Sequence, residues 1–263
     1  MDRSKIAPGL AVALILALAV AAAGCGGGIQ PTAPAARTGS GTGAVTYSGG
    51  SPEDAASLLK AAADAVKAKV SPDLGVHFTM DLTTTTVGKS ISSQAEGDMV
   101  YPDRIRMTSQ TLTGGQPQKT DFIMVGGNVY ERTGSGAWQS SPAPVSRPLG
   151  LASITNYIDY ARSSRFFGQE SLKGGLKTYH VQIDVDTKLE AEEAEKNAAA
   201  PSLRQSLEAL KSAAVTVDLW IGIDDHLIYQ ENVKSVNSAQ ALNSLMEFRF
   251  SNWGEPVQIK EPY

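Results

Sequence analysis

The sequence predicts an α+β domain whose centre is a single curved, largely antiparallel β-sheet with helices covering its concave side. Short runs of alternating apolar and polar residues recur between residues 76 and 250, and this two-residue period is typical of strands with one buried face. Turn-forming pairs such as Gly114–Gly115 and Gly174–Gly175 separate the runs, which indicates hairpins. A sheet of roughly ten strands must curl and have its apolar face covered, because a flat sheet would leave that face in water.

Composition narrows the class of protein. The chain has 263 residues, of which 42% are hydrophobic and 19% charged, so it can form a folded core and is not a disordered chain. Its 23 basic and 27 acidic residues give no electrostatic surface for a nucleic-acid partner. A single cysteine excludes an intramolecular disulfide framework and a cysteine-based zinc cluster.

Residues 1–24 are expected to be an export signal. Arg3 and Lys5 precede an apolar run from Leu10 to Ala23, which is the arrangement of a secretory signal peptide. As a helix the run is about 21 Å long, whereas the hydrocarbon core of a bilayer is about 30 Å thick. We therefore expect removal of the segment rather than a membrane span.

Cys25 follows this signal directly. The sequence from Ala22 to Cys25 resembles the lipobox of bacterial lipoproteins, in which the cysteine becomes the acylated first residue. Ala22 departs from that pattern, which prefers Leu, Val or Ile; the alternative is a secretory signal followed by an incidental free thiol. The resemblance implies lipidation of Cys25 with chains such as palmitate, and a lipid-anchored, extracytoplasmic protein at the cell membrane. Residues 25–50, rich in Gly, Thr and Pro, are then a flexible tether with an end-to-end distance of about 25 to 30 Å.

The folded domain is expected to span residues 51–263 and to begin with a helix. Ser51 and Pro52 supply an N-cap and a first-turn proline, and Ser71–Pro72 ends the helix. Its apolar residues recur at helical spacing, which predicts one buried face: Ala55, Leu58, Leu59, Ala62, Val66 and Val70.

The strand pattern follows and is interrupted twice. The first interruption, from Leu149 to Ala161, predicts a helix that covers the sheet; the second, from Lys188 to Ala213, predicts an Ala-rich helix that restarts at Pro201. The strand-like runs contain Val76–Leu82, Met99–Tyr101, Ile105–Met107, Phe122–Met124, Val129–Tyr130, Tyr179–Val185, Val217–Ile223, Leu227–Tyr229 and Met246–Phe250.

The inward positions of these elements are the candidate binding residues. All methionines after Met1 lie in strands, and methionine adapts its shape to flexible apolar ligands. The same residues equally suit an ordinary core, because apolar stripes usually are core. The candidate lining consists of Phe78, Met80, Leu82, Met99, Ile105, Met107, Phe122, Met124, Ile154, Tyr157, Ile158, Val181, Ile183, Leu219, Ile221, Met246 and Phe248.

No pattern of reactive residues points to catalysis, a cofactor or a metal. The histidines His77, His180 and His226 have no metal-ligand spacing, and the Gly-x-Ser-x-Gly motif of many hydrolases is absent from the sequence. Asp184 and Asp186 share a strand face, which we interpret as an outer, solvated face because Val181, Ile183 and Val185 take the other side.

Several motifs of the domain resemble the LppX/LprAFG lipoproteins, relatives of the lipoprotein carriers LolA and LolB. The resemblance extends from about Ser51 to the C-terminus, although Lys188–Ala213 is longer than expected for that family. The residues that carry it are Gly97–Ile105, Asn128–Arg132 with Trp138, Val217–Ile221, Asp224–Ile228 and Phe248–Val257.

The resemblance implies a LolA-like fold, an unclosed half-barrel of largely antiparallel strands wrapped over helices, with an apolar cavity for the acyl chains of a lipid or glycolipid. It implies no enzyme activity. The expected function is to carry or present that lipid within the cell envelope, with an envelope transporter as a possible protein partner. The alternative is a non-catalytic interaction or sensor module of the same fold with no transported ligand; a hydrolase is a third and weaker hypothesis.

Overall fold

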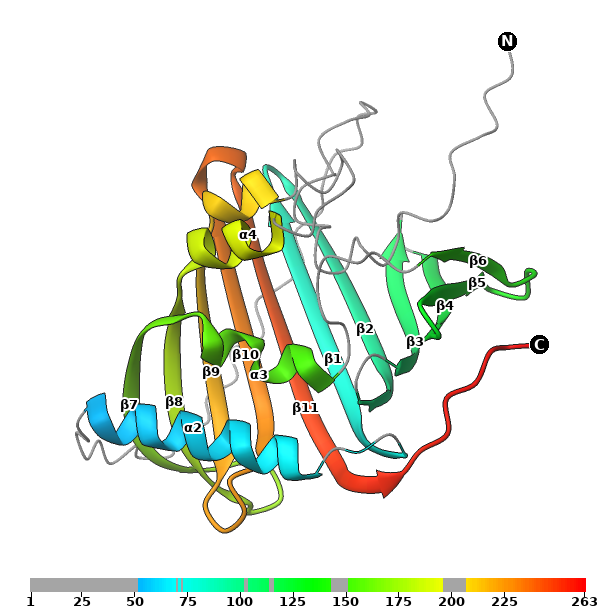
Figure 1. The fold of residues 1–263 in the computed structure, drawn as a ribbon. Helices are drawn as coiled ribbons and strands as arrows, with labels where there is room; N and C mark the ends of the chain where they lie inside the picture. The colour runs from blue at the N-terminus through cyan, green and yellow to red at the C-terminus, as the bar shows by residue number, and fades with distance from the viewer. Residues whose placement is uncertain are drawn as a thin grey trace.

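The computed structural model describes residues 52–69, 71, 73–101, 104–113, 116–142, 151–195 and 207–263. The proposed signal, Cys25 and the tether over residues 25–50 lie outside the described residues. Within the described part, one sheet of eleven strands dominates the molecule (Figure 1). The strands are β1 (Leu74–Thr86), β2 (Lys89–Val100), β3 (Arg104–Thr113), β4 (Gln116–Val125), β5 (Asn128–Thr133), β6 (Gln139–Pro142), β7 (Ala161–Ser171), β8 (Lys177–Val185), β9 (Ala214–Gly222), β10 (Ile228–Asn237) and β11 (Leu242–Pro256).

The strand order confirms the predicted fold class. The order is β6-β5-β4-β3-β2-β1-β11-β10-β9-β8-β7, and every pairing is antiparallel. Strands β6 and β7 are the two edges, so the sheet is open. It consists of two meanders that meet where β1 pairs with β11, a contact between the first and last strands of the domain.

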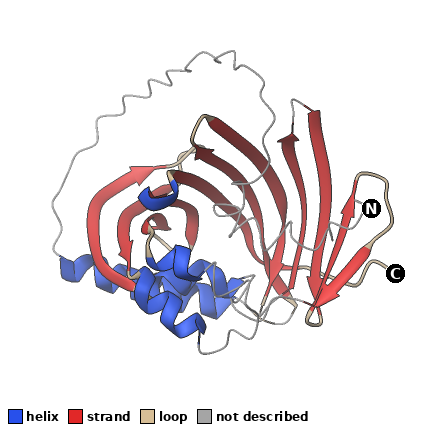
Figure 2. Cartoon of the chain, turned by 90° about the horizontal axis from the view of Figure 1, so that it is seen from above, coloured by secondary structure: helices blue, strands red, loops and turns tan. Residues whose placement is uncertain are grey.

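The helices lie on one face of this sheet. Helix α2 (Pro52–Lys69) contacts β7 and α3 (Leu151–Asp159), and α3 also contacts β8. Both helices lie over the part of the sheet from β7 to β11 (Figures 1 and 2). Ala55, Leu59, Ala62 and Val66 of α2 are all buried against the sheet, so the helical spacing predicted the covering face of α2.

Two of the expected helices differ from the prediction. Helix α3 ends at Asp159, and Ala161 already begins β7, an edge strand that the sequence pattern did not reveal. Most of its side chains are exposed or half-buried, because an edge strand with two bulges packs poorly on both faces. In the region from Lys188 to Ala213, α4 covers Thr187–Glu195 and a helical turn covers residues 207–211, while residues 196–206 lie outside the described part.

Bulges bend the sheet. The register shifts between Gly75 and His77 on β1, between Ile228 and Gln230 on β10, and twice on β7. Each bulge bends its strand and increases the local twist. Seen from above, the sheet curves around with the helices on its concave side (Figure 2). We call this concave side the inner face and the opposite side the outer face.

The C-terminal residues pack on the outer face. Ile259 is 3% exposed and belongs to a small apolar cluster with Val100, Ile123 and Tyr130. The ring of Tyr263 meets that of Tyr130 edge-on, with 5.6 Å between the ring centres. The sheet therefore has apolar packing on both faces near β2 to β5.

Among the described residues, we find no helix that is both long and apolar enough to cross a bilayer.

Candidate functional site: the apolar inner face

The predicted lining residues come together on the inner face. Strand alternation places them on the same side as α2 and α3, and Phe78, Phe122, Val181, Ile183, Leu219 and Ile221 are almost fully buried there. All the candidates with described side chains lie in one hydrophobic cluster or, for Ile158 and Phe248, are partly buried against it. The side chain of Ile154 lies outside the described residues. That these clustered side chains line a ligand-binding cavity stays a prediction from the sequence.

Cross-strand pairing arranges these side chains in rows. One row runs from Phe78 on β1 across Gly97 and Met107 to Phe122 on β4. A second row joins Met99, Ile105 and Met124 on the same strands. Gly97 has no side chain, but the other residues of both rows belong to one hydrophobic cluster, so the apolar surface extends across β1 to β4. The described helices α2 and α3 lie over β7 to β11, so the inner face on β2 to β4 extends beyond them (Figure 1).

Aromatic rings mark the centre of this surface. Phe78 of β1 lies 6.0 Å from Phe248 of β11, and Phe248 stacks on Phe250 with 5.8 Å between the ring centres. Trp253 extends the group, 5.9 Å from Phe250. The sequence list of lining residues omitted Phe250, Val217 and Val76, although simple continuation of the two-residue period from their neighbours would have included them.

The inner face changes character along the strands. Towards the turn that joins β1 to β2, the inward residues become hydroxyl-bearing, and Thr84, Ser93 and Ser109 are all buried. Ser93 Oγ lies 3.0 Å from Thr111 Oγ1, and Ser109 Oγ donates to the carbonyl oxygen of Thr120. Ser93 and Ser109 therefore have partners within the sheet.

Two acidic side chains also belong to the inner face, and neither was among the candidates. Glu131 of β5 pairs with Phe122, and burial raises the pKa of its carboxyl. Glu231 of β10 is 2% exposed between Leu219 and Phe248. The sequence around Glu231 has no regular alternation because β10 begins with a bulge, so its inward direction could not be read from the pattern.

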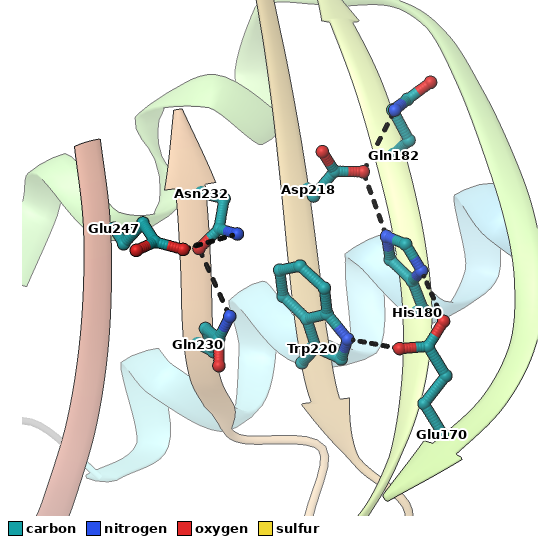
Figure 3. A network of polar contacts seen from close by, with 8 residues as sticks. All are labelled: Glu170, His180, Gln182, Asp218, Trp220, Gln230, Asn232 and Glu247. Atoms are coloured by element: carbon teal, nitrogen blue, oxygen red, sulfur yellow. Dashed lines mark hydrogen bonds and ion pairs between the residues drawn. The ribbon is translucent and has the colours of Figure 1, made fainter. Parts of the chain in front are cut away.

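The outer face carries a polar network instead (Figure 3). His180 Nδ1 lies 2.8 Å from Glu170 Oε1, and His180 Nε2 lies 2.9 Å from Asp218 Oδ1. Trp220 Nε1 donates to Glu170 Oε2 at 2.8 Å, and the His180 ring stacks between Trp220 and Phe167. Burial opposes the charge on His180, but the hydrogen bonds to Asp218 and Glu170 outweigh it and raise the pKa of the imidazole. The network joins β7, β8 and β9 side by side.

The other sequence-based site candidates have structural partners. His77 Nδ1 lies 3.0 Å from Asp98 Oδ1, and His226 sits in a turn with a positive φ of 57°. Asp184 accepts a hydrogen bond from Ser163, and Asp186 accepts one from the backbone of Leu189 at the start of α4. Within the described ranges, no group of three or more acidic, histidine or cysteine side chains could hold a metal ion.

Comparison with solved structures identifies the fold. The crystal structure of LprF from Mycobacterium bovis matches 81% of this chain and 99% of its own chain, with 17% identity and a TM-score of 0.50. The chain has the fold of LprF. The resemblance to the LppX/LprAFG lipoproteins is thereby confirmed at the level of the fold.

More distant matches were also found. A LolA superfamily protein from Nitrosomonas europaea covers 79% of this chain and 94% of its own, with 9% identity and a TM-score of 0.32. MucB of Pseudomonas aeruginosa, solved in complex with MucA, covers 80% of this chain and 59% of its own, with 11% identity and a TM-score of 0.34. No protein-family model matches the chain, and no curated protein matches it in sequence.

Proposed function

We propose that this protein is an extracytoplasmic lipoprotein that binds the acyl chains of a lipid or glycolipid on the inner face of its sheet. It carries or presents that lipid within the cell envelope and performs no chemistry on it. The observation that carries the proposal is the apolar row from Phe78 on β1 to Phe122 on β4. This row extends beyond the part of the sheet that α2 and α3 cover (Figure 1). The LprF fold agrees with it.

Transfer energetics explain how such a surface would compete with a membrane. Burial of apolar surface contributes about 0.8 kcal/mol per methylene, so an apolar site can hold an acyl chain without a covalent step. The site must adapt to chains of different shape. Met80 on β1, Met107 on β3 and Met124 on β4 supply that adaptability, because an unbranched thioether changes its conformation at low cost.

The N-terminal sequence supports the proposed location. Residues 1–24 would export the chain, and acylated Cys25 would anchor it. Two or more acyl chains give stable membrane attachment, and the tether over residues 25–50 would keep the domain close to the bilayer from which it takes its lipid. A transporter in the same envelope would be the natural protein partner for loading or release.

The decisive experiment is to identify what the protein holds. The full chain is purified from its own envelope in mild detergent, extracted with organic solvent, and analysed by mass spectrometry. We expect a stoichiometric acylated lipid besides the chains on Cys25. A protein that is consistently empty would contradict the proposal and would favour a tethered interaction module.

A matched pair of tryptophan variants tests the inner face. Met107 and Gln110 are both on β3, but Met107 is buried on the inner face and Gln110 is exposed. We expect Met107→Trp to lower lipid uptake about tenfold, equivalent to about 1.4 kcal/mol, because the larger ring takes the space of about two methylenes. Gln110→Trp should leave uptake unchanged. Equal uptake by both variants, with circular dichroism showing intact folds, would place the lipid elsewhere.

A further inference from the structure

Glu231 is an acidic residue whose side chain lies among apolar side chains of the inner face. It lies in the middle of β10, and its inner-face neighbours across the sheet are Leu219 of β9 and Phe248 of β11. Val233, two residues further along β10, is also buried on this face. The Glu231 side chain is 2% exposed, so nearly all of it lies among hydrocarbon side chains.

This carboxyl has no polar partner among the described residues. No hydrogen bond or ion pair to it is found there, and burial alone raises its pKa to about 8. Three other buried polar side chains differ. Ser93, Thr178 and Asn237 each make a side-chain hydrogen bond within the fold. A buried polar group normally has a partner, and an exception calls for an explanation.

The polar side chains next to Glu231 in the sequence form hydrogen bonds on the outer face. Gln230 Nε2 donates to Asn232 Oδ1, and Asn232 Nδ2 donates to Glu247 on β11 (Figure 3). Strand alternation directs these side chains outward, on the opposite side from Glu231. Asp218 and Arg249 are likewise engaged on the outer face, with His180 and Asp81. These polar side chains therefore face away from Glu231, although a neutral carboxylic acid carries an O–H donor that needs an acceptor.

We propose that Glu231 is the polar anchor of the bound lipid, and that its carboxyl donates a hydrogen bond to an ester carbonyl oxygen of the ligand. This inference rests on the proposed function and narrows the ligand class to acyl esters. An ester carbonyl is the polar group attached directly to an acyl chain, so it enters an apolar site together with that chain. Burial of a cationic headgroup at this apolar site would cost far more hydration free energy than burial of an ester carbonyl.

The test compares an ester lipid with an ether lipid of the same length. Dihexadecanoylglycerol and its dihexadecyl ether analogue share their chains and hydroxyl group, and differ in the carbonyl oxygens. Each is offered to the full chain with Cys25→Ser, which cannot be acylated and therefore does not pellet with the bilayer, from vesicles of dialkyl phosphatidylcholine, which contain no carboxylic ester. The vesicles are then removed by centrifugation, and the bound lipid is quantified by mass spectrometry. The wild-type protein should prefer the ester about tenfold, as one hydrogen bond would give.

Three variants locate the origin of that preference. Glu231→Leu should bind both lipids equally, with ether binding undiminished. Glu231→Gln should keep much of the preference because the amide is still a donor. Glu247→Gln, on the outer face of the adjacent strand, should behave as wild type. Glu231→Met replaces the leucine variant if that one fails to fold.

The outcomes separate this inference from the proposed function. Similar ester preference in wild type and Glu231→Leu, or no preference in the wild type, would overturn the role of Glu231 while lipid binding stands. If neither probe binds to the wild type, while extraction also finds no lipid, both proposals fail together.

Discussion

Single residues show how closely the strands of the inner face approach one another. Gly97 lies on β2 between Phe78 and Met107. A Cβ atom added at Gly97 would lie 2.1 Å from the carbonyl oxygen of Arg106 and 2.7 Å from Met107 Cα. These are backbone atoms, which cannot rotate away as a side chain would. The glycine is therefore required by the packing between β2 and β3.

Gly97→Ala should destabilise the fold without altering any polar contact. We expect the free energy of unfolding to fall by about 1–3 kcal/mol, the usual cost of overpacking a core. Urea denaturation measures it. Gly136→Ala, in an exposed turn where the nearest atom is 3.1 Å from the added Cβ, should cost less. Equal losses for both variants would mean that the close approach at Gly97 is relieved by movement of β3.

His180 predicts a pH dependence on the outer face. Its hydrogen bonds to Asp218 and Glu170 raise its pKa above the ordinary 6.5. A raised pKa of the folded state means that the folded protein binds the proton more tightly than the unfolded chain. The stability from this network is fully present below about pH 6.5 and is lost as pH rises through the raised folded value.

We expect the stability difference between wild type and His180→Gln to shrink as pH rises. Urea denaturation of both proteins at intervals from pH 5 to pH 9 would measure it. Glu231 also makes stability fall with rising pH, between its ordinary pKa of 4.5 and its raised pKa of about 8. Both proteins contain Glu231, so the stability difference between them reports His180 alone. A difference that stays constant with pH would show that stacking with Trp220 and Phe167, rather than charge, supports the network.

Among whole elements, the C-terminal segment packs on the sheet in a way that the sequence did not predict. Residues 257–263 form no strand or helix, but Val257 N donates to the carbonyl oxygen of Asp73 and Ile259 is buried on the outer face with Val100 and Ile123. Isolated apolar residues after a last strand have no period, so only contacts in the folded chain reveal their packing.

Removal of residues 257–263 should lower stability but not lipid uptake. Exposure of Val100, Ile123 and Tyr130 together with loss of buried Ile259 should cost about 2–3 kcal/mol or more. Ile259→Ala should reproduce most of the loss in urea denaturation, whereas Lys260→Ala, at an exposed position, should not. Uptake should persist because the inner face is on the other side of the sheet; its disappearance in a folded truncated protein would link the two faces.

Elements also show where sequence patterns succeed. Helix α2 and strands β1, β8 and β9 were predictable because each has one buried and one polar face over many residues. The edge strand β7 was missed because its burial pattern is irregular. Periodicity reports burial on one face, and it weakens wherever an element is at an edge, is bulged, or packs on both sides.

For the whole molecule, the central pairing of β1 with β11 decides the architecture. The two strands are separated by more than 150 residues, yet Phe78 pairs with Phe250 and Met80 with Phe248. This contact makes one sheet out of two meanders, and α3, which precedes β7, lies over the inner face of that sheet. No local pattern encodes that pairing, because hairpins are signalled by their turns and this pair has none.

The sequence by itself determined the largely antiparallel sheet, the first helix and the inward direction of most lining residues, since alternation and turn residues act over a few positions. The tertiary structure alone decided that Gly97 is enclosed by β3, that His180 is held between Glu170 and Asp218, and that Glu231 is buried without a described partner. These features depend on strand register and curvature. Register and curvature arise from residues far apart in the chain that meet only when the sheet closes on its helices.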